Sequence, residues 1–283
     1  MESIPELRRI CQTTRPSIFR DFLSGWYYRL AIYFTWVCLR LGLSANQVTL
    51  LSGAVACVGG LLLTSNEPWF VLAGVLCFHI FAILDMSDGE VARYRGQGGA
   101  AGHYLDWAMH FVSSSALMLG LFFSSLSSLD GVLILIGVLA VMVPLLDKSI
   151  TTSTWTVIAW TRLRDLQKGK LGDCGDFEVD IRATVAVPLW RRRLMFLALA
   201  PLQDHWLPFG LLLLALAALV GHKVGLYVPD YRFHLLLYIG VIGVPHLALR
   251  VRRIMITSAL ADGYRRLFCP SQPIKLPEDE FLG

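Results

Sequence analysis

Six long apolar runs, separated by short polar segments, are the feature that most constrains how this sequence can fold. Each run is long enough to form most or all of a helix that crosses a lipid bilayer. Charged residues stand mainly at the ends of the runs. We therefore expect an all-α integral membrane protein with six transmembrane helices, at residues 48–63, 69–84, 103–123, 131–146, 206–220 and 233–249. The helices of the second and fourth spans are expected to continue beyond their apolar runs, to about residues 93 and 162.

The composition agrees with a membrane protein and favours no other class. Hydrophobic residues make up 55% of the chain and charged residues 16%, which is more apolar than a typical soluble domain. The net charge of +4 is too small to indicate a nucleic-acid partner, and residues 1–15 are too polar for a cleavable signal peptide. The cysteines form no CxxC pair and are expected to be inert buried thiols: Cys11, Cys38, Cys57, Cys77, Cys174 and Cys269.

The segment before the first span predicts a helix lying in the membrane interface. After a polar tail over residues 1–16, residues 17–40 repeat aromatic and aliphatic residues every three or four positions, with Arg20 and Arg29 between them. A helix packed on a soluble core is the alternative. The whole chain, 1–283, is then one membrane domain, with a six-helix bundle over 43–263, a polar loop over 164–193 and a flexible tail over 270–283.

Three aspartates near the ends of two spans carry the chemistry. Asp85 and Asp88 share one face of the second span, and Asp106 shares a face of the third with His110. If the two faces meet, the carboxylates repel one another unless cations neutralise them. An acidic, oxygen-rich site of this kind suits Mg²⁺ or Mn²⁺ better than zinc.

The stretch from Asp85 to His110 resembles the CDP-alcohol phosphotransferase family, whose motif reads D-x2-D-G-x2-A-R-x8-G-x3-D-x3-D. The matching positions, with the family's spacing, are Asp85, Asp88, Gly89, Ala92, Arg93, Gly102 and Asp106. The fourth aspartate of the motif is replaced by His110.

The resemblance implies that a substituted phosphate group passes from a CDP-alcohol, such as CDP-diacylglycerol, to an acceptor hydroxyl, with release of CMP in phospholipid biosynthesis. Divalent ions, two in number or fewer if His110 is not a ligand, would be held by Asp85, Asp88 and Asp106. A homodimer is also implied. The acceptor alcohol stays open, and so does the question whether the lipid is donor or acceptor.

His110 takes the place of the family's catalytic base, and an imidazole suits that role near neutral pH. It can instead ligate a metal or merely fill space. The CDP moiety is expected to lie against the remaining motif positions and two residues that begin the first span: Gly89, Ala92, Arg93, Gly102, Asn46 and Thr49. For Asn46 and Thr49 the alternative is a helix cap and a packed threonine, and for Arg93 it is a snorkelling membrane anchor.

Other polar residues in the spans are weaker candidates. His79, His103 and His246 are interpreted as structural, whereas Asp147 and Lys148 either pair with each other or line an acceptor pocket. A non-catalytic nucleotide-binding member of the family and a cation or proton transporter remain alternatives, because His110 departs from the motif and intramembrane carboxylates also serve transport. No acidic residue continues the path outward in the second or third span, which counts against transport.

The distribution of arginine and lysine predicts the orientation in the membrane. Basic residues precede the first span, lie between the second and third at Arg93 and Arg95, and follow the fourth and sixth. The turns at 64–68 and 124–130 have none, and Lys223 and Arg232 are a mild exception. The positive-inside rule then places both termini and the Asp85–His110 stretch on the cytoplasmic side, where nucleotides are. A bacterial inner membrane is the expected location.

Overall fold

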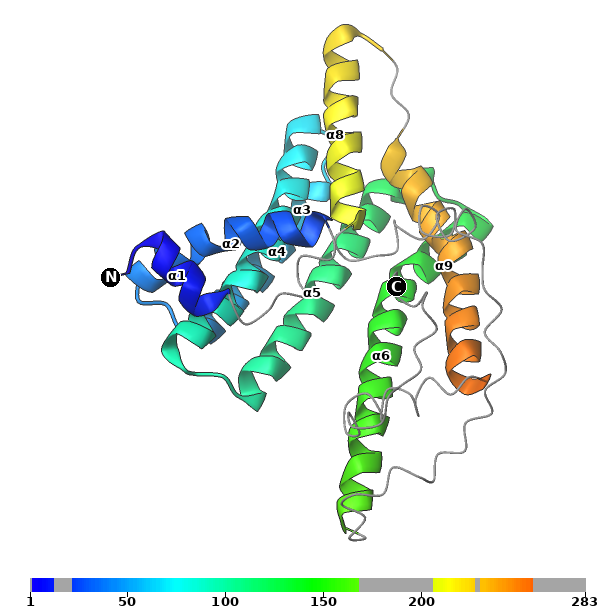
Figure 1. The fold of residues 1–283 in the computed structure, drawn as a ribbon. Helices are drawn as coiled ribbons and strands as arrows, with labels where there is room; N and C mark the ends of the chain where they lie inside the picture. Colours follow the sequence, from blue (N-terminus) through cyan, green and yellow to red (C-terminus); the bar gives the residue numbers. More distant parts are fainter. Residues whose placement is uncertain (1, 13–21, 168–205, 227–229, 257–283) are drawn as a thin grey trace. The chain divides into compact units, whose positions relative to one another are not determined.

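The computed structural model describes residues 2–12, 22–167, 206–226 and 230–256, and these residues are predominantly helical (Figure 1). The predicted tail over 270–283, and the part of the predicted loop 164–193 beyond residue 167, lie outside them. The helices are α1 Ile4–Cys11, α2 Phe22–Arg40, α3 Ala45–Leu63, α4 Pro68–Arg95, α5 Ala100–Ser125, the 3₁₀ turn η2 Leu126–Ser128, α6 Gly131–Gln167, α8 Trp206–Val224 and α9 Tyr231–Ile256.

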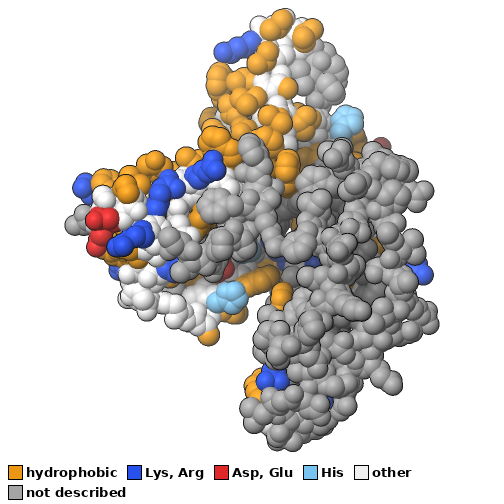
Figure 2. All heavy atoms as spheres, in the orientation of Figure 1, with side chains coloured by type: hydrophobic (Ala, Val, Ile, Leu, Met, Phe, Trp, Pro, Cys, Tyr) orange, Lys and Arg blue, Asp and Glu red, His pale blue; other side chains and the backbone are white. Residues whose placement is uncertain are grey.

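The six predicted membrane helices are confirmed. Among the described residues, six helices have the length and hydropathy to cross a membrane, at Ala45–Leu63, Pro68–Arg95, Ala100–Ser128, Gly131–Arg164, Trp206–Val224 and Tyr231–Arg252. Much of their apolar surface faces outward, and Figure 2 shows hydrophobic side chains covering the exposed surface of α8. Such a surface suits lipid rather than water. The protein is an integral membrane protein.

The chain divides into two compact units. One contains Met1–Leu145 and Trp190–Val244, and the other contains Leu146–Leu189 and Pro245–Gly283, so that α6 and α9 each contribute to both. The single membrane domain over 1–283 stays a prediction.

Close helix packing in the first unit brings the ends of three helices together. A Cβ at Gly60 would lie 2.5 Å from the carbonyl oxygen of Ala116, and one at Gly74 would lie 2.8 Å from the carbonyl oxygen of Gly59. Because only glycine allows backbones to approach so closely, α3 packs directly against both α5 and α4. Short connections make successive helices antiparallel, so the end of α4 lies beside the beginnings of α3 and α5 (Figure 1).

The N-terminal segment contains a helix where the sequence suggested a polar tail. In α1, Ser3 and Glu6 form a capping box, with the Ser3 amide donating to Glu6 Oε2 at 2.8 Å. Leu7 and Cys11 are fully buried together with Ile32 of α2. The apolar positions of α1 are too few to span a membrane but enough to pack the helix against the rest of this unit.

Helix α2 has two apolar faces rather than one. Tyr27, Ala31 and other residues on one face are buried against α4. A second face carries large exposed apolar side chains at Trp26, Leu30, Tyr33, Phe34 and Val37. Arg29 and Arg40 are also exposed. This pattern supports the predicted interfacial location, which stays a prediction, and the helix begins no earlier than Phe22 among the described residues.

Several helices extend beyond the predicted spans. Helix α5 begins at Ala100 rather than 103, α8 ends at Val224, and α9 runs from Tyr231 to Ile256 through Pro245. Helix α6 is longest, because it continues through a run of threonines whose hydroxyls donate to carbonyls one turn earlier, as Thr152 does to Lys148 at 2.9 Å. These internal bonds satisfy the polar side chains within the helix, so α6 continues past the apolar run to Gln167, close to the predicted continuation to about residue 162.

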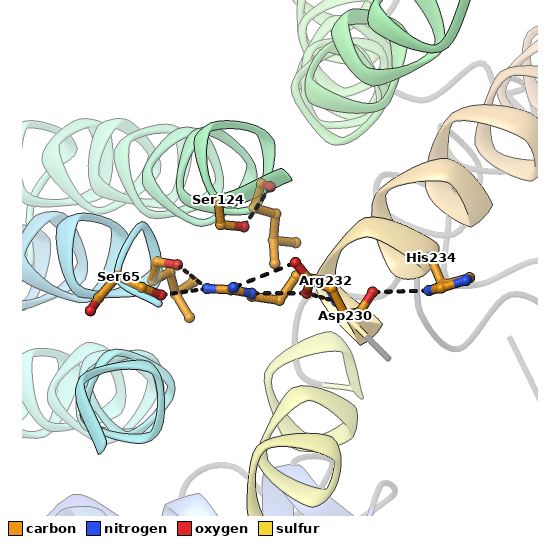
Figure 3. A network of polar contacts seen from close by, with 7 residues as sticks. Ser65, Ser124, Asp230, Arg232 and His234 are labelled. Carbon is orange, nitrogen blue, oxygen red and sulfur yellow. Dashed lines mark hydrogen bonds and ion pairs between the residues drawn. The ribbon is translucent and has the colours of Figure 1, made fainter. Parts of the chain in front are cut away.

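Arg232 is a buried structural residue rather than a loop charge. Its side chain is 9% exposed and extends from the start of α9 to the end of α3, as Figure 3 shows. The guanidinium donates to the carbonyl oxygens of Leu63 at 3.0 Å and Ser65 at 2.6 Å, and pairs with Asp230 at 3.1 Å. Arg232 therefore caps a helix C-terminus, which explains why it departs from the expected distribution of basic residues.

We expect Arg232→Ala to destabilise the protein. The change removes several charge-assisted hydrogen bonds from a buried site, which costs about 2 kcal/mol or more. Thermal unfolding in detergent should show a midpoint several degrees lower. Arg252→Ala, at an exposed position of the same helix, is the matched control and should leave the midpoint unchanged. Equal midpoints for the two variants would contradict the capping role.

The second unit joins α6 to α9 through a charged pair. Arg250 Nη1 donates to Asp147 Oδ1, and Arg250 Nη2 donates to Thr151 Oγ1 at 2.8 Å. Asp147 thus has an arginine partner, while Lys148 is buried beside it. That these residues line an acceptor pocket stays a prediction.

The sequence predicts inert buried thiols, and the burial is confirmed for only two of the described cysteines. Cys11, Cys38, Cys57 and Cys77 are all free, but Cys57 is exposed and Cys77 is half-buried. Burial raises the pKa of the Cys11 thiol to about 11, so it stays protonated and unreactive at neutral pH. Cys174 and Cys269 lie outside the described residues.

Candidate functional site

The site forms where α4 ends and α3 and α5 begin. Helix α4 ends at Arg95 and is capped by Gly96, whose φ of 62° is left-handed; the Gln97 amide donates back to the Ala92 carbonyl at 2.9 Å. Four residues later α5 begins at Ala100. This short connection returns the chain beside the last turns of α4, so that Asp106 and His110 face the aspartates of α4.

Asp85, Asp106 and His110 meet across α4 and α5 as the sequence predicts. His110 Nε2 lies 3.3 Å from Asp85 Oδ1 and 3.6 Å from Asp106 Oδ1. One ligand atom from each residue lies within 4.8 Å of the other two. The three side chains are 15%, 34% and 25% exposed, in the order Asp85, Asp106, His110, so the group is sheltered yet open to a ligand.

The His110 ring is oriented by its surroundings. It packs against Phe81 of α4 in a T-shaped arrangement, with ring centroids 5.9 Å apart and planes at 83°. Carboxylates lie on the side of Nε2. The imidazole is therefore held between an apolar wall and two acidic groups, in a position where it can exchange a proton or accept a cation.

Asp88 is placed differently from the other two aspartates. It is 7% exposed, and Thr49 Oγ1 of α3 donates to its Oδ2 at 2.6 Å. Among the described residues, Asp88 is outside the group whose ligand atoms converge. The structure thus joins Thr49 to the aspartates through Asp88, and the role of Asp88 as a metal ligand stays a prediction.

The small residues of the motif leave space beside polar groups. A Cβ at Gly102 would lie 3.5 Å from Asn46 Oδ1, which places Asn46 opposite this part of α5. A Cβ at Gly89 would lie 3.2 Å from Arg93 Nη1. Ala92 follows Asp88 by four residues and so shares its face of α4. The predicted positions therefore gather around the end of α4.

Sequence reasoning missed a second buried carboxylate, Glu90. It is fully buried and accepts hydrogen bonds from Gln12 Nε2 and Thr35 Oγ1, both at 2.7 Å. The available signal was its position in the sequence, two residues after Asp88. Glu90 lies on a different face of the helix from the other aspartates. A search confined to the face of the aspartates overlooks it.

The other histidines fit structural interpretations. His79 Nδ1 lies 2.6 Å from the Tyr27 hydroxyl, which joins α4 to α2. His103 accepts from Trp107 Nε1 at 3.1 Å within α5. His246 is half-buried in α9.

The residues present fit a divalent cation. An ion with ligands at roughly 2.1 Å holds neighbouring ligand atoms roughly 3 Å apart, and the separations of 3.3 and 3.6 Å from His110 Nε2 are close to this. Two carboxylates with an imidazole accept Mn²⁺ readily and Mg²⁺ through their oxygens. Asp85, Asp106 and His110 could hold such an ion.

The chain belongs to the CDP-alcohol phosphatidyltransferase family, whose sequence profile matches residues 43–220. That region includes every predicted site residue, and it begins after α1 and α2.

Individual relatives agree with this family. Ceramide phosphoethanolamine synthase of Drosophila melanogaster is 30% identical over 42% of this chain and 33% of its own length. Phosphatidylinositol phosphate synthase of Mycobacterium marinum is 31% identical over 50% of this chain and 55% of its own. The chain thus spans between a third and about half of the length of these relatives.

A solved structure shares the fold. The phosphatidylinositol phosphate synthase of Mycobacterium tuberculosis, crystallised with CDP-DAG bound, superposes with a TM-score of 0.52 at 18% identity, over 82% of this chain and 96% of that one. This likeness concerns the arrangement of helices.

Proposed function

We propose that this protein transfers a substituted phosphate group from a CDP-alcohol donor to an acceptor hydroxyl and releases CMP. The observation that carries the proposal is the meeting of Asp85, Asp106 and His110 at the end of α4, beside the Asp88–Thr49 pair. Membership of the CDP-alcohol phosphatidyltransferase family supports the same reaction. The protein would then act in phospholipid biosynthesis.

The proposed reaction assigns a task to each group of the site. Asp85, Asp88 and Asp106 would hold divalent Mg²⁺ or Mn²⁺, which would supply positive charge to offset that of the pyrophosphate. Gly89, Ala92 and Gly102 leave room for the CDP moiety, with Asn46 and Thr49 on the facing helix. Arg93 contacts the pyrophosphate through its guanidinium.

His110 serves as the base for the acceptor hydroxyl. Its Nε2 takes the proton as the hydroxyl oxygen bonds to the phosphorus that carries the donor alcohol, and the bond from that phosphorus to CMP breaks. The nearby carboxylates of Asp85 and Asp106 stabilise the imidazolium that results.

We propose CDP-diacylglycerol as the donor. The support is the CDP-DAG bound by the structural neighbour and the naming of several relatives as phosphatidylinositol phosphate synthases. The Drosophila relative is named for making ceramide phosphoethanolamine, which favours a second arrangement, in which the lipid is the acceptor. The acceptor alcohol and a homodimeric assembly stay predictions.

Release of CMP by the purified protein tests the reaction. The protein in detergent is given CDP-diacylglycerol or CDP-ethanolamine, Mn²⁺ or Mg²⁺, and in turn glycerol phosphate, inositol phosphate, serine or a ceramide. Metal-dependent CMP release that requires an acceptor supports the proposal and identifies the lipid's role. Absence of release with every pair, from a protein that binds CDP, would favour the non-catalytic alternative.

We propose that both termini and the site face the cytoplasm, in a bacterial inner membrane. The support is the sequence distribution of basic residues under the positive-inside rule, with Arg93 and Arg95 in the last turn of α4, the end that carries the site. A reporter enzyme that works only in the cytoplasm should be active when it is fused after Gly283. A reporter that registers outside the cytoplasm would overturn this orientation.

A further inference from the structure

Helix α1 lies along one face of the last turns of α4, beside the face that carries the motif. Gln12 Nε2 donates to Glu90 Oε1 at 2.7 Å, Arg93 Nε donates to the Cys11 carbonyl at 2.8 Å, and the Tyr94 hydroxyl donates to Glu2 Oε2 at 2.5 Å. Positions 90, 93 and 94 share one side of a helix. The two ends of α1 are thus fastened to the same stripe of α4.

The contact at Gln12 is buried and is fixed by several hydrogen bonds. Glu90 and Thr35 are fully buried and Gln12 is 9% exposed. Gln12 Nε2 also donates to the Tyr28 carbonyl at 2.9 Å, while the Tyr28 hydroxyl donates to the Gln12 carbonyl at 3.2 Å. Since buried polar groups are costly to leave without partners, this network holds the end of α1 in one position relative to α4.

Arg93 stands at the boundary between the two faces of α4. Its Nε is held by the Cys11 carbonyl, one residue before Gln12. Its Nη1 lies 3.2 Å from the position that a Cβ on Gly89 would occupy. The missing side chain at Gly89 and the carbonyl at Cys11 together direct the guanidinium over the backbone next to Asp88.

We propose that α1, through the Gln12–Glu90 hydrogen bond and the Cys11 carbonyl, positions Arg93 for the pyrophosphate of the donor. This extends the donor site to residues outside the region 43–220 that the family profile matches. Gln12 and Glu90 are positioning residues, since they act through Arg93. The proposal rests on the function proposed above for Arg93.

The primary test is Gln12→Met, which keeps the length of the side chain but removes its donor. We expect the KM for the CDP-donor to rise roughly tenfold with kcat within about twofold, as for a lost contact made in ground and transition states alike. In an Arg93→Ala background the same change should have no further effect on KM, because the two residues act on one contact. Independent, multiplicative effects would overturn the proposal.

Two matched variants separate positioning from general stability. Ile10→Ala changes an exposed residue of α1 and should keep the wild-type KM. Glu90→Gln keeps an acceptor for Gln12 and offers a donor to Thr35, whose hydroxyl also accepts, so it should stay within about threefold of the wild-type KM, whereas Glu90→Ala should behave like Gln12→Met. A wild-type KM in Gln12→Met would refute the proposal.

A second measurement needs neither an active nor a purified protein. Phenylglyoxal labelling of arginines in isolated membranes, read by peptide mass spectrometry, reports the accessibility of Arg93. Labelling should rise several-fold in Gln12→Met relative to wild type and Ile10→Ala. Equal labelling in all three would show that α1 does not position Arg93. An inactive wild type with the expected labelling would instead refute only the proposed reaction.

Discussion

Replacing Asp85 or Asp106 with asparagine is expected to abolish CMP release while leaving the protein folded. Each change removes one negative charge but keeps the size of the side chain, so the group of Asp85, Asp106 and His110 loses an anionic ligand. Because a bound divalent ion contributes several kcal/mol of charge stabilisation, the rate should fall by roughly three orders of magnitude or more. Mn²⁺ binding, measured by electron paramagnetic resonance, should weaken in parallel.

The same variants are expected to keep or gain thermal stability although they lose activity. Without metal, carboxylates held close together repel one another, and a neutral amide relieves that repulsion. The midpoint of thermal unfolding in chelator should therefore be equal to or higher than that of the wild type, as is common when a functional charge is removed. Loss of activity together with a sharply lower midpoint would mean that the aspartates are structural.

The variant Asp88→Asn tests whether Asp88 is a metal ligand, which stays a prediction. Thr49 already donates to its Oδ2, and an amide oxygen can accept that bond equally well. If Asp88 holds the metal, the variant loses activity with its fold intact; retained activity at saturating metal contradicts the assignment. Asp130→Asn, at an exposed residue just before α6, is the matched control and should keep full activity.

Much of the membrane fold could be predicted from the sequence, because the length of an apolar run is enough to indicate a membrane-spanning helix. The helix of the fourth span was predicted to continue to about residue 162, and α6 ends close to this at Gln167, because its threonines satisfy their hydroxyls within the helix. Helix α1, in contrast, was missed. It is short and polar. Its features are a capping box at Ser3 and Glu6 and apolar contacts through the buried residues Leu7 and Cys11, and these indicate a helix only when the surface against which it packs is known.

The site was predictable to the extent that it depends on helical spacing. Asp85, Asp106 and His110 were placed together because residues four apart share a face. Spacing within one helix says nothing about partners on another, so the hydrogen bond from Thr49 to Asp88 and the burial of Glu90 between α1 and α2 required the structure. Arg232 shows the same limit, since its partners at the end of α3 are distant in sequence.

His110 is the residue at which this chain departs from its family's motif, and its removal is the second decisive experiment. If His110 is the base, His110→Ala should lower kcat by roughly 10²- to 10⁴-fold. Binding of the CDP-donor and of Mn²⁺ should stay close to wild type, because the aspartates remain. His103→Ala changes a histidine one turn before Trp107 on the same helix and should leave kcat unchanged.

Comparing His110→Asp with His110→Ala distinguishes a catalytic base from a metal ligand at this position. His110→Asp keeps a group that accepts protons and should recover part of the lost rate. Its activity should persist to lower pH than that of the wild type, because a carboxylate in water takes up a proton roughly two pH units below an imidazole. A metal ligand predicts instead that His110→Ala weakens Mn²⁺ binding and that high metal concentration restores its rate. Near-normal turnover of His110→Ala with an unchanged pH profile would exclude the base, since no other described imidazole lies within the group that Asp85 and Asp106 form.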